Sequence, residues 1–247
     1  MTARPAIVAH RGWATRYPEN TLQSLSAALA AGVSHVEFDV QLTADGVPLL
    51  IHDATLERTA GRPDSVLDLP WSRLAGITVR REGDDETAPG APLPSLAEAV
   101  RMLRDHPEAV AFVELKRHSI ERFGAADCVA RCLAELRPLG TRAVLTSFEA
   151  AALTAADAHC PVAWVLRQYD EAALERARRL APNYLFCNHE KLPPDGSNLP
   201  AGPWSWVIYE VRTAALARAL AGRGAAFVET MAVGELLAEL RAKGDAT

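Results

Sequence analysis

The sequence predicts an α/β fold, a TIM (β/α)8 barrel with a β-hairpin and a small insertion between strands 2 and 3. Short apolar runs alternate with amphipathic helical segments along most of the 247 residues. With the return strand of the hairpin set aside, eight runs follow this repeat, the number that closes a barrel of ~250 residues. Polar residues also gather where the first strands end. A doubly wound open sheet is the alternative, but it more often carries a glycine-rich phosphate loop after strand 1.

The predicted strands begin near residues 6, 35, 110, 143, 162, 184, 205 and 225. The first is a short apolar run that ends in His10. In the helix that follows, Leu22 and Leu25 mark one face, and Asn20 can cap its amino end. Strand 2 comes directly after this helix, so the sequence begins with a parallel βαβ unit.

Strand 2 opens the predicted hairpin. Glu37 and Asp39 alternate with apolar residues, so both acids share one face of the strand. Asp45-Gly46 is a strong signal for a two-residue turn, and such a turn places Asp39 opposite His52. Two carboxylates beside an imidazole suit a divalent cation and proton transfer. A surface hairpin with solvated acids is the alternative.

Residues 53–94 are predicted as a small insertion or loop, with a short helix near 70–75. Its segment 80–94 is polar and rich in proline and glycine. A loop this long is often functional, so the segment is interpreted either as a lid over the acids or as a tolerated surface excursion.

The rest of the chain alternates between the two kinds of element. Helices are predicted at 95–105, 125–136, 150–158, 171–180, 213–221 and 233–242. Strands are predicted at 110–116, 143–147, 162–166, 184–188, 205–210 and 225–229. The organisation indicates one domain over residues 1–247.

Composition and charge narrow the function. There is no uncharged apolar run long enough to cross a bilayer and no export-signal pattern, so we expect a cytoplasmic protein without membrane insertion. The net charge of −5 argues against nonspecific nucleic-acid binding and requires a local positive cluster or a metal for an anionic substrate. The four cysteines are interpreted as small reduced core residues. A homo-oligomer is compatible with the sequence.

Active sites of such barrels lie at the carboxyl ends of the strands. The first three strands and the hairpin end in three carboxylates, two histidines, one arginine and one lysine: Glu37, Asp39, Glu114, His10, His52, Arg11 and Lys116. Like charges crowded in a low-dielectric mouth repel unless a cation neutralises them. Carboxylate ligands favour Mg²⁺ or Ca²⁺ over zinc. His35 shares the face of Glu37 one layer deeper, where a hydrogen-bonded core role is expected.

The same residues belong to an ordered series of motifs between His10 and Lys116: HRG, PENT, ExDV, TxDG, HD followed by TLERT, LPSL and ELK. As a set these motifs resemble glycerophosphodiester phosphodiesterases. The resemblance implies three ligands of one divalent cation, Mg²⁺ or Ca²⁺, namely Glu37, Asp39 and Glu114. It further implies a general acid and base, His10 and His52, and two phosphate contacts, Arg11 and Lys116.

The implied reaction is metal-dependent hydrolysis of a small glycerophosphodiester, such as glycerophosphocholine or glycerophosphoethanolamine. Its products are glycerol 3-phosphate and an alcohol. The implied nucleophile is the glycerol 2-hydroxyl, which gives a cyclic phosphate that water then opens. The chain departs from the family pattern late in the sequence, where Tyr209 replaces an expected amide and Glu229-Thr230 replaces a T-D pair. We therefore expect a modified alcohol pocket, with three candidate lining residues, Trp206, Glu210 and Arg58.

Two other functions remain open from the sequence. A related barrel lyase acting on phospholipids would use similar metal and histidine chemistry, but should show an export signal and an exposed apolar loop. A noncatalytic phosphodiester-binding protein should have lost a histidine or a ligand, and this chain keeps all of them.

Overall fold

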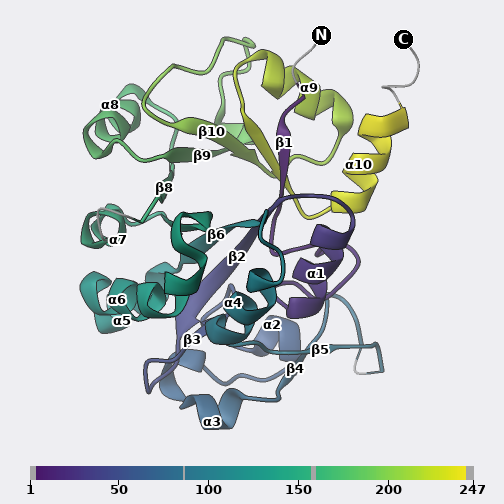
Figure 1. Cartoon of the computed structure of the whole chain (residues 1–247), viewed down its shortest axis with the longest axis vertical. Coiled ribbons are helices and arrows are strands. Elements are labelled where there is room, and N and C mark those ends of the chain that lie inside the picture. Colours follow the sequence, from purple (N-terminus) through teal and green to yellow (C-terminus); the bar gives the residue numbers. More distant parts are fainter. Residues whose placement is uncertain (1–3, 86, 157–159, 243–247) are drawn as a thin grey trace.

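The computed structural model describes residues 4–85, 87–156 and 160–242, and within them eight parallel strands close into a barrel (Figure 1). Each of these strands pairs with the next one along the chain, and pairing of the last with the first completes the ring. The predicted TIM barrel is confirmed. Its strands are β1 (Ala6–Ala9), β2 (His35–Leu42), β6 (Val110–Leu115), β7 (Ala143–Ser147), β8 (Val162–Val165), β9 (Tyr184–Asn188), β10 (Ser205–Tyr209) and β11 (Phe227–Thr230).

The helices of the repeat lie outside the strands (Figure 1). They are α1 (Leu22–Ala30), α4 (Leu96–Arg104), α5 (Arg117–Phe123), α6 (Ala125–Leu136), α7 (Ala150–Ala155), α8 (Glu171–Leu180), α9 (Ala214–Gly222) and α10 (Val233–Ala242), with 3-10 turns η2 (Arg137–Arg142) and η3 (His189–Lys191). The short helix α5 was not predicted, because it is too brief to show a periodic apolar stripe. The helix predicted at 150–158 ends at Ala155, and residues 157 and 158 lie outside the described residues.

The start of α1 differs from the prediction. Thr21, rather than Asn20, is the N-cap, and it exchanges hydrogen bonds with Ser24 in a capping box. Asn20 instead adopts a left-handed backbone conformation with φ of 55°, which asparagine tolerates better than most residues. Its side-chain amide donates to Asp39 Oδ2 at 2.9 Å, and its Oδ1 accepts the Asp39 backbone N–H at 3.0 Å. The residue expected as a cap therefore fixes an acid of strand β2.

The hairpin register is shifted by one residue from the prediction. Strand β3 (Pro48–Leu50) pairs antiparallel with β2, and Val40 lies opposite Leu50. The turn has three residues, because Thr43 N–H donates to Val47 O at 3.0 Å and Gly46 takes a φ of +79°. A type I turn followed by a left-handed glycine is a common alternative to the two-residue turn. Asp39 therefore does not stand opposite His52, which follows the end of β3.

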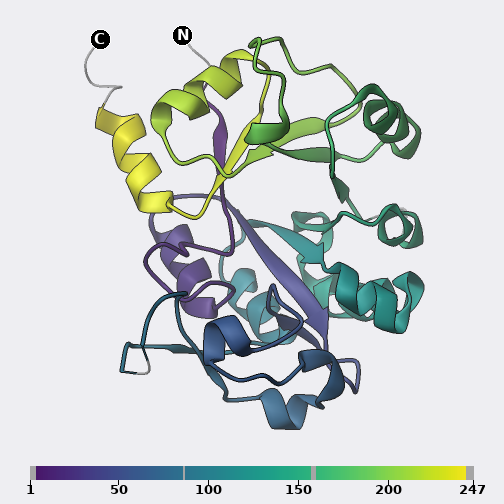
Figure 2. The same ribbon diagram turned by 180° about the vertical axis from the view of Figure 1, so that it is seen from behind.

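The insertion after β3 is more ordered than a loop. It contains α2 (Glu57–Ala60), the 3-10 turn η1 (Val66–Asp68), α3 (Trp71–Leu74) and a two-stranded sheet of β4 (Thr78–Val79) and β5 (Ala91–Pro92). It also has its own apolar cluster of Leu49, Ile51, Leu56, Val66, Leu74, Val79 and Leu93. Figure 1 and Figure 2 both show it at the end of the molecule away from the two termini.

Alternation along the strands separates the barrel interior from its packing against the helices. One interior layer is largely aromatic: His35 contacts Phe112 and Phe227, with ring centroids 6.2 and 4.9 Å apart. His35 Nδ1 also shares a hydrogen bond of 2.9 Å with Ser34 Oγ. Two residues further along their strands, Glu37, Glu114 and Glu229 occupy the next inward positions. The apolar layer thus closes the interior beneath a set of acids.

Candidate active site

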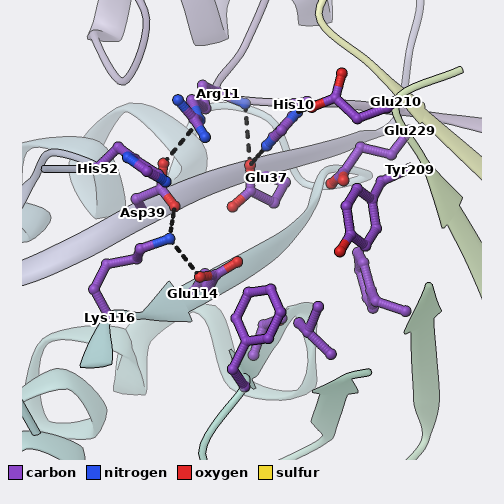
Figure 3. A pocket seen from close by; sticks show the side chains of 14 residues that line it. His10, Arg11, Glu37, Asp39, His52, Glu114, Lys116, Tyr209, Glu210 and Glu229 are labelled. Atoms are coloured by element: carbon purple, nitrogen blue, oxygen red, sulfur yellow. Dashed lines mark hydrogen bonds and ion pairs between the residues drawn. The ribbon is translucent and has the colours of Figure 1, made fainter. Parts of the chain in front are cut away.

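A pocket opens where the first strands end, and it gathers the cluster that the sequence indicated (Figure 3). It is lined by His10, Arg11, Glu37, Asp39, His52, Glu114, Lys116, Thr146, Phe148, Val165, Phe186, Tyr209, Glu210 and Glu229. All seven residues that the sequence placed in the metal, histidine and phosphate sets are present. No described residue of 53–94 lines it, so the described part of segment 80–94 contributes nothing to the pocket wall.

Three carboxylates form the centre of the pocket. Each of Glu37, Asp39 and Glu114 offers one oxygen, and these oxygens lie within 4.8 Å of one another. The arrangement follows from the sheet, because Glu37 and Asp39 face the same side of β2 and Asp39 is in register with Glu114 on β6. Three hard oxygen donors at this spacing suit a divalent cation such as Mg²⁺ or Ca²⁺.

Two cations flank this centre. Lys116 Nζ lies 2.6 Å from Glu114 Oε1 and 3.0 Å from Asp39 Oδ1. Arg11 Nε approaches Asp39 Oδ2 at 3.1 Å from the other side. Burial alone would raise the pKa of the Asp39 carboxyl, but Lys116 and Arg11 outweigh it and hold this pKa well below its usual range. Asp39 is therefore charged and fixed before any ligand binds.

Glu37 is held on one side only. Its Oε2 accepts the backbone N–H of Arg11 at 3.1 Å, whereas its Oε1 is buried without a hydrogen-bond partner among the described residues. Burial, followed by repulsion from Asp39, raises the pKa of Glu37 well above its ordinary value. A buried carboxylate oxygen without a partner is costly, and a bound cation would remove that cost. The donor set thus fits the metal that the resemblance implies.

The two histidines lie on either side of Arg11 (Figure 3). His10 is 9% exposed, with Nε2 3.9 Å from Glu37 Oε2 and Nδ1 3.8 Å from Glu210 Oε1. Burial, reinforced by Arg11, lowers the pKa of His10 to about 3, so its imidazole is neutral near pH 7. A neutral imidazole can accept a proton.

His52 is anchored from behind. Its Nδ1 lies 2.6 Å from Asp53 Oδ1, and Arg58 Nε donates to the other oxygen of Asp53 at 2.7 Å. Arg58 also contacts both oxygens of Glu19 at 2.8 Å, and Glu19 in turn accepts from Arg11 at 3.1 Å. A chain of ion pairs therefore links the two sides of the pocket, and it fixes the ring of His52.

The three candidate pocket residues have different positions. Glu210 lines the pocket. Arg58 does not line it and lies behind Asp53. Trp206 points outward from β10 into the core between barrel and helices, where its Nε1 donates to Pro200 O at 2.8 Å and its ring lies 5.9 Å from that of Trp204. Alternation along β10 gives the inward position to Tyr209, which lines the pocket.

Glu229 is the pocket acid that the candidate set left out. It is 3% exposed, and its Oε1 has no hydrogen-bond partner among the described residues. Burial, followed by repulsion from Glu114, raises its pKa well above the ordinary value. The available signal was its position at the end of the last strand, two residues beyond Phe227 on the inward face.

Comparison with known proteins places this geometry in a family. The model of the glycerophosphoryl diester phosphodiesterase family matches residues 10–202. This range includes all seven residues of the metal, histidine and phosphate sets. The chain belongs to this family. Among the described residues, no helix is long and apolar enough to cross a membrane.

Relatives within the glycerophosphodiester phosphodiesterases are moderately similar. Glycerophosphodiester phosphodiesterase 1 of Bos taurus is 31% identical over 148 residues, which cover 59% of this chain and 43% of the bovine protein. The Bacillus altitudinis glycerophosphodiester phosphodiesterase is 32% identical over 142 residues, covering 58% and 57% of the two chains. The matched region thus spans less than two thirds of either relative.

A solved structure supports the fold over nearly the whole chain. A phosphodiesterase of Oleispira antarctica, in complex with the product sn-glycerol-3-phosphate, superposes with a TM-score of 0.83. The match covers 96% of this chain and 97% of that one at 23% identity, so it supports the barrel architecture.

Proposed function

We propose that this protein hydrolyses glycerophosphodiesters to sn-glycerol 3-phosphate and an alcohol, in a reaction that requires one divalent cation held by Glu37, Asp39 and Glu114. The observation that carries the proposal is the pocket itself, which combines three carboxylates within 4.8 Å, two histidines and two fixed cations. Membership of the family supports the reaction class, and the product complex of the Oleispira antarctica phosphodiesterase supports a small substrate of this kind.

Each group has a role that its environment suits. A bound divalent cation would neutralise charge on a non-bridging phosphoryl oxygen. Arg11 and Lys116 stabilise the remaining negative charge on the phosphoryl group, since both reach the pocket beside Asp39. These two side chains are already ordered by ion pairs, so little conformational entropy is lost when the phosphodiester binds.

The histidines carry the protons. One imidazole removes the proton from the attacking hydroxyl as its bond to phosphorus forms. The other donates a proton to the alkoxide as the old phosphorus–oxygen bond breaks and the alcohol leaves. Where the attacking hydroxyl is that of the glycerol, water then opens the resulting cyclic phosphate to give glycerol 3-phosphate. Their positions on either side of Arg11 support this division of roles, because a phosphodiester bound between them would have one imidazole near each end (Figure 3). Each such step contributes roughly 10²–10⁴ in rate.

The test is release of glycerol 3-phosphate from glycerophosphocholine by the purified protein with Mg²⁺, with Ca²⁺ and after chelation. We expect metal-dependent turnover that falls by about 10²–10⁴ in the His10→Ala variant. His118→Ala is the matched control, since His118 is exposed on α5 outside the pocket, and it should keep wild-type activity. Turnover that survives both chelation and loss of His10 would refute the proposal.

A further inference from the structure

The proposed reaction leaves two acids of the pocket without a role, Glu229 and Glu210. Figure 3 shows both on the side of the pocket away from His52 and Lys116, with Tyr209 beside Glu229. Glu229 is only 3% exposed, yet its Oε1 has no hydrogen-bond partner among the described residues. A buried, unpartnered carboxylate oxygen that lines a pocket requires a ligand or a proton to offset its cost.

The charges of the residues that line the pocket indicate what kind of ligand it suits. Its lining holds five carboxylates against two fixed cations, Arg11 and Lys116. One divalent cation neutralises two of the three excess negative charges, and a phosphodiester then adds one more. Without Glu210 and Glu229, the net charge of the pocket with the metal and the phosphodiester bound would be zero. The two extra acids therefore favour a substrate that brings a positive charge of its own.

The surfaces near these acids suit an organic cation rather than a small hydrated one. Phe148, Phe186 and Tyr209 line the same pocket, and Val165 adds an apolar contact. Aromatic faces next to a carboxylate bind ammonium and quaternary ammonium groups through cation–π attraction. The ring of Phe148 already accepts one cation, because the Arg167 guanidinium lies 5.0 Å from its centroid.

A second metal ion is a poorer fit for these residues. Within the part of the chain that the structure describes, one set of three potential ligands brings its donor atoms within 4.8 Å of one another, and that set is Glu37, Asp39 and Glu114. Glu229 is not a member. Repulsion from Glu114 raises the pKa of Glu229, but the Glu229 carboxylate is outside this set of three ligands.

We propose that Glu229, together with Glu210 and Tyr209, forms a subsite for a positively charged alcohol group, an ammonium or trimethylammonium carried by the leaving alcohol. This inference rests on the proposed hydrolysis and adds a preference within it. Diesters of amino alcohols, such as glycerophosphocholine, are then preferred over diesters of neutral polyols, such as glycerophosphoglycerol. Glu229 determines substrate selectivity, while the carboxylates of β2 and β6 bind the metal.

The experiment compares kcat/KM for glycerophosphocholine and glycerophosphoglycerol at equal ionic strength. We expect wild type to favour the choline diester, and Glu229→Gln to lower the ratio of the two values by about tenfold. Glu190→Gln is the matched control, because Glu190 is exposed on the groove next to Glu210 and outside the pocket, and its ratio should equal that of wild type. A Glu229→Gln variant that loses both activities equally would overturn the inference.

A second measurement separates this inference from the proposed function. Calorimetry with tetramethylammonium chloride should show binding to wild type that weakens about tenfold in Glu229→Gln. If no diester is cleaved, the proposed function fails, and this binding still decides the subsite. Equal kcat/KM for the two diesters in wild type would refute the subsite and leave hydrolysis standing. A drop from two bound Mg²⁺ ions to one in Glu229→Gln would replace the subsite by a second metal site.

Discussion

Asp39 and Glu229, on opposite sides of the barrel, are held in opposite ways. On the β1, β2 and β6 side, Asp39 lies between Arg11 and Lys116, at 3.1 and 3.0 Å. On the β10 and β11 side, Glu229 is equally buried but has an oxygen without a partner among the described residues. Asp39, paired with two cations, keeps its charge and orders its surroundings before substrate binds. Unpaired acids destabilise the empty pocket and become favourable only when a cation arrives.

The largest effect should come from breaking this contrast at Asp39. Asp39→Asn leaves Arg11 with Glu19 and Lys116 with Glu114 as their remaining charged partners in the pocket, so we expect the free energy of unfolding to fall by about 1.5–3 kcal/mol. Activity should fall by about 10²–10³ or more, since the substitution also removes a proposed metal ligand. Urea unfolding of metal-free protein and glycerol 3-phosphate release measure the two losses.

Glu229→Gln is the counterpart in the other half. Burial and Glu114 raise the pKa of Glu229, so its charged form destabilises the fold at pH 8. The variant should therefore be about 1–2 kcal/mol more stable than wild type in metal-free urea unfolding at pH 8. The gain should shrink as pH falls to 4.5 and below, because the carboxyl then becomes protonated in the unfolded state as it already is in the folded state. Equal destabilisation by both substitutions would erase the contrast.

The next effect is a pH dependence of metal affinity. Burial is the main cause of the raised pKa values of Glu37 and Glu114. Above pH 4.5, the metal-free folded protein therefore binds more protons than the unfolded chain, and its stability falls as pH rises toward the raised values. A cation displaces these protons, so its apparent affinity should rise about tenfold per pH unit for each proton released.

Calorimetric Mg²⁺ titrations in buffers of different ionisation enthalpy measure both the affinity and the protons released. His10 does not interfere, because its pKa of about 3 keeps it neutral through this range. Affinity that stays constant between pH 5.5 and 8 would show that these carboxyls are ionised without the metal. That result would contradict the inference that Glu37 and Glu114 hold protons in the metal-free pocket.

A smaller effect is expected from the ion pairs that join the two histidine sides. Lysine cannot reproduce the forked contacts of Arg58 with Asp53 and Glu19. Arg58→Lys should therefore lower kcat about tenfold with little change in KM, since it loosens His52 rather than the phosphate contacts. The control is Arg62→Lys. Arg62 lies in the same insertion, and its one ion pair among the described residues is with Asp64. A loss confined to thermal stability would make Arg58 merely structural.

The sequence predicted one half of the barrel better than the other. Period-two alternation and the motif spacing identified the acids of β2 and β6, because strand parity alone decides which side chains face inward. The hairpin register was wrong, since Asp45-Gly46 is compatible with turns of two and of three residues. His52 nevertheless lines the pocket, because the chain leaves the sheet after Leu50.

The acids of the second half could not be ranked from sequence. The local sequence around Glu229 does not show whether its carboxylate has a hydrogen-bond partner, because that depends on side chains from several strands. The partner of Arg58 was equally hidden, because Glu19 is 39 residues away. The order within the insertion was also missed, since its apolar cluster joins residues from Leu49 to Leu93 without a regular spacing.

The smallest effect should come from Trp206, where parity sharpens the comparison once more. Trp206 points outward and Tyr209 inward from the same strand, β10. Trp206→Phe removes the hydrogen bond to Pro200 O and should cost about 1–2 kcal/mol of stability, with kcat/KM for both diesters unchanged. Tyr209→Phe should change stability less. It should alter the ratio of kcat/KM for glycerophosphocholine to kcat/KM for glycerophosphoglycerol, because its ring and hydroxyl face the pocket. A selectivity change in Trp206→Phe would mean that the outer core, and not the inward face alone, shapes the alcohol subsite.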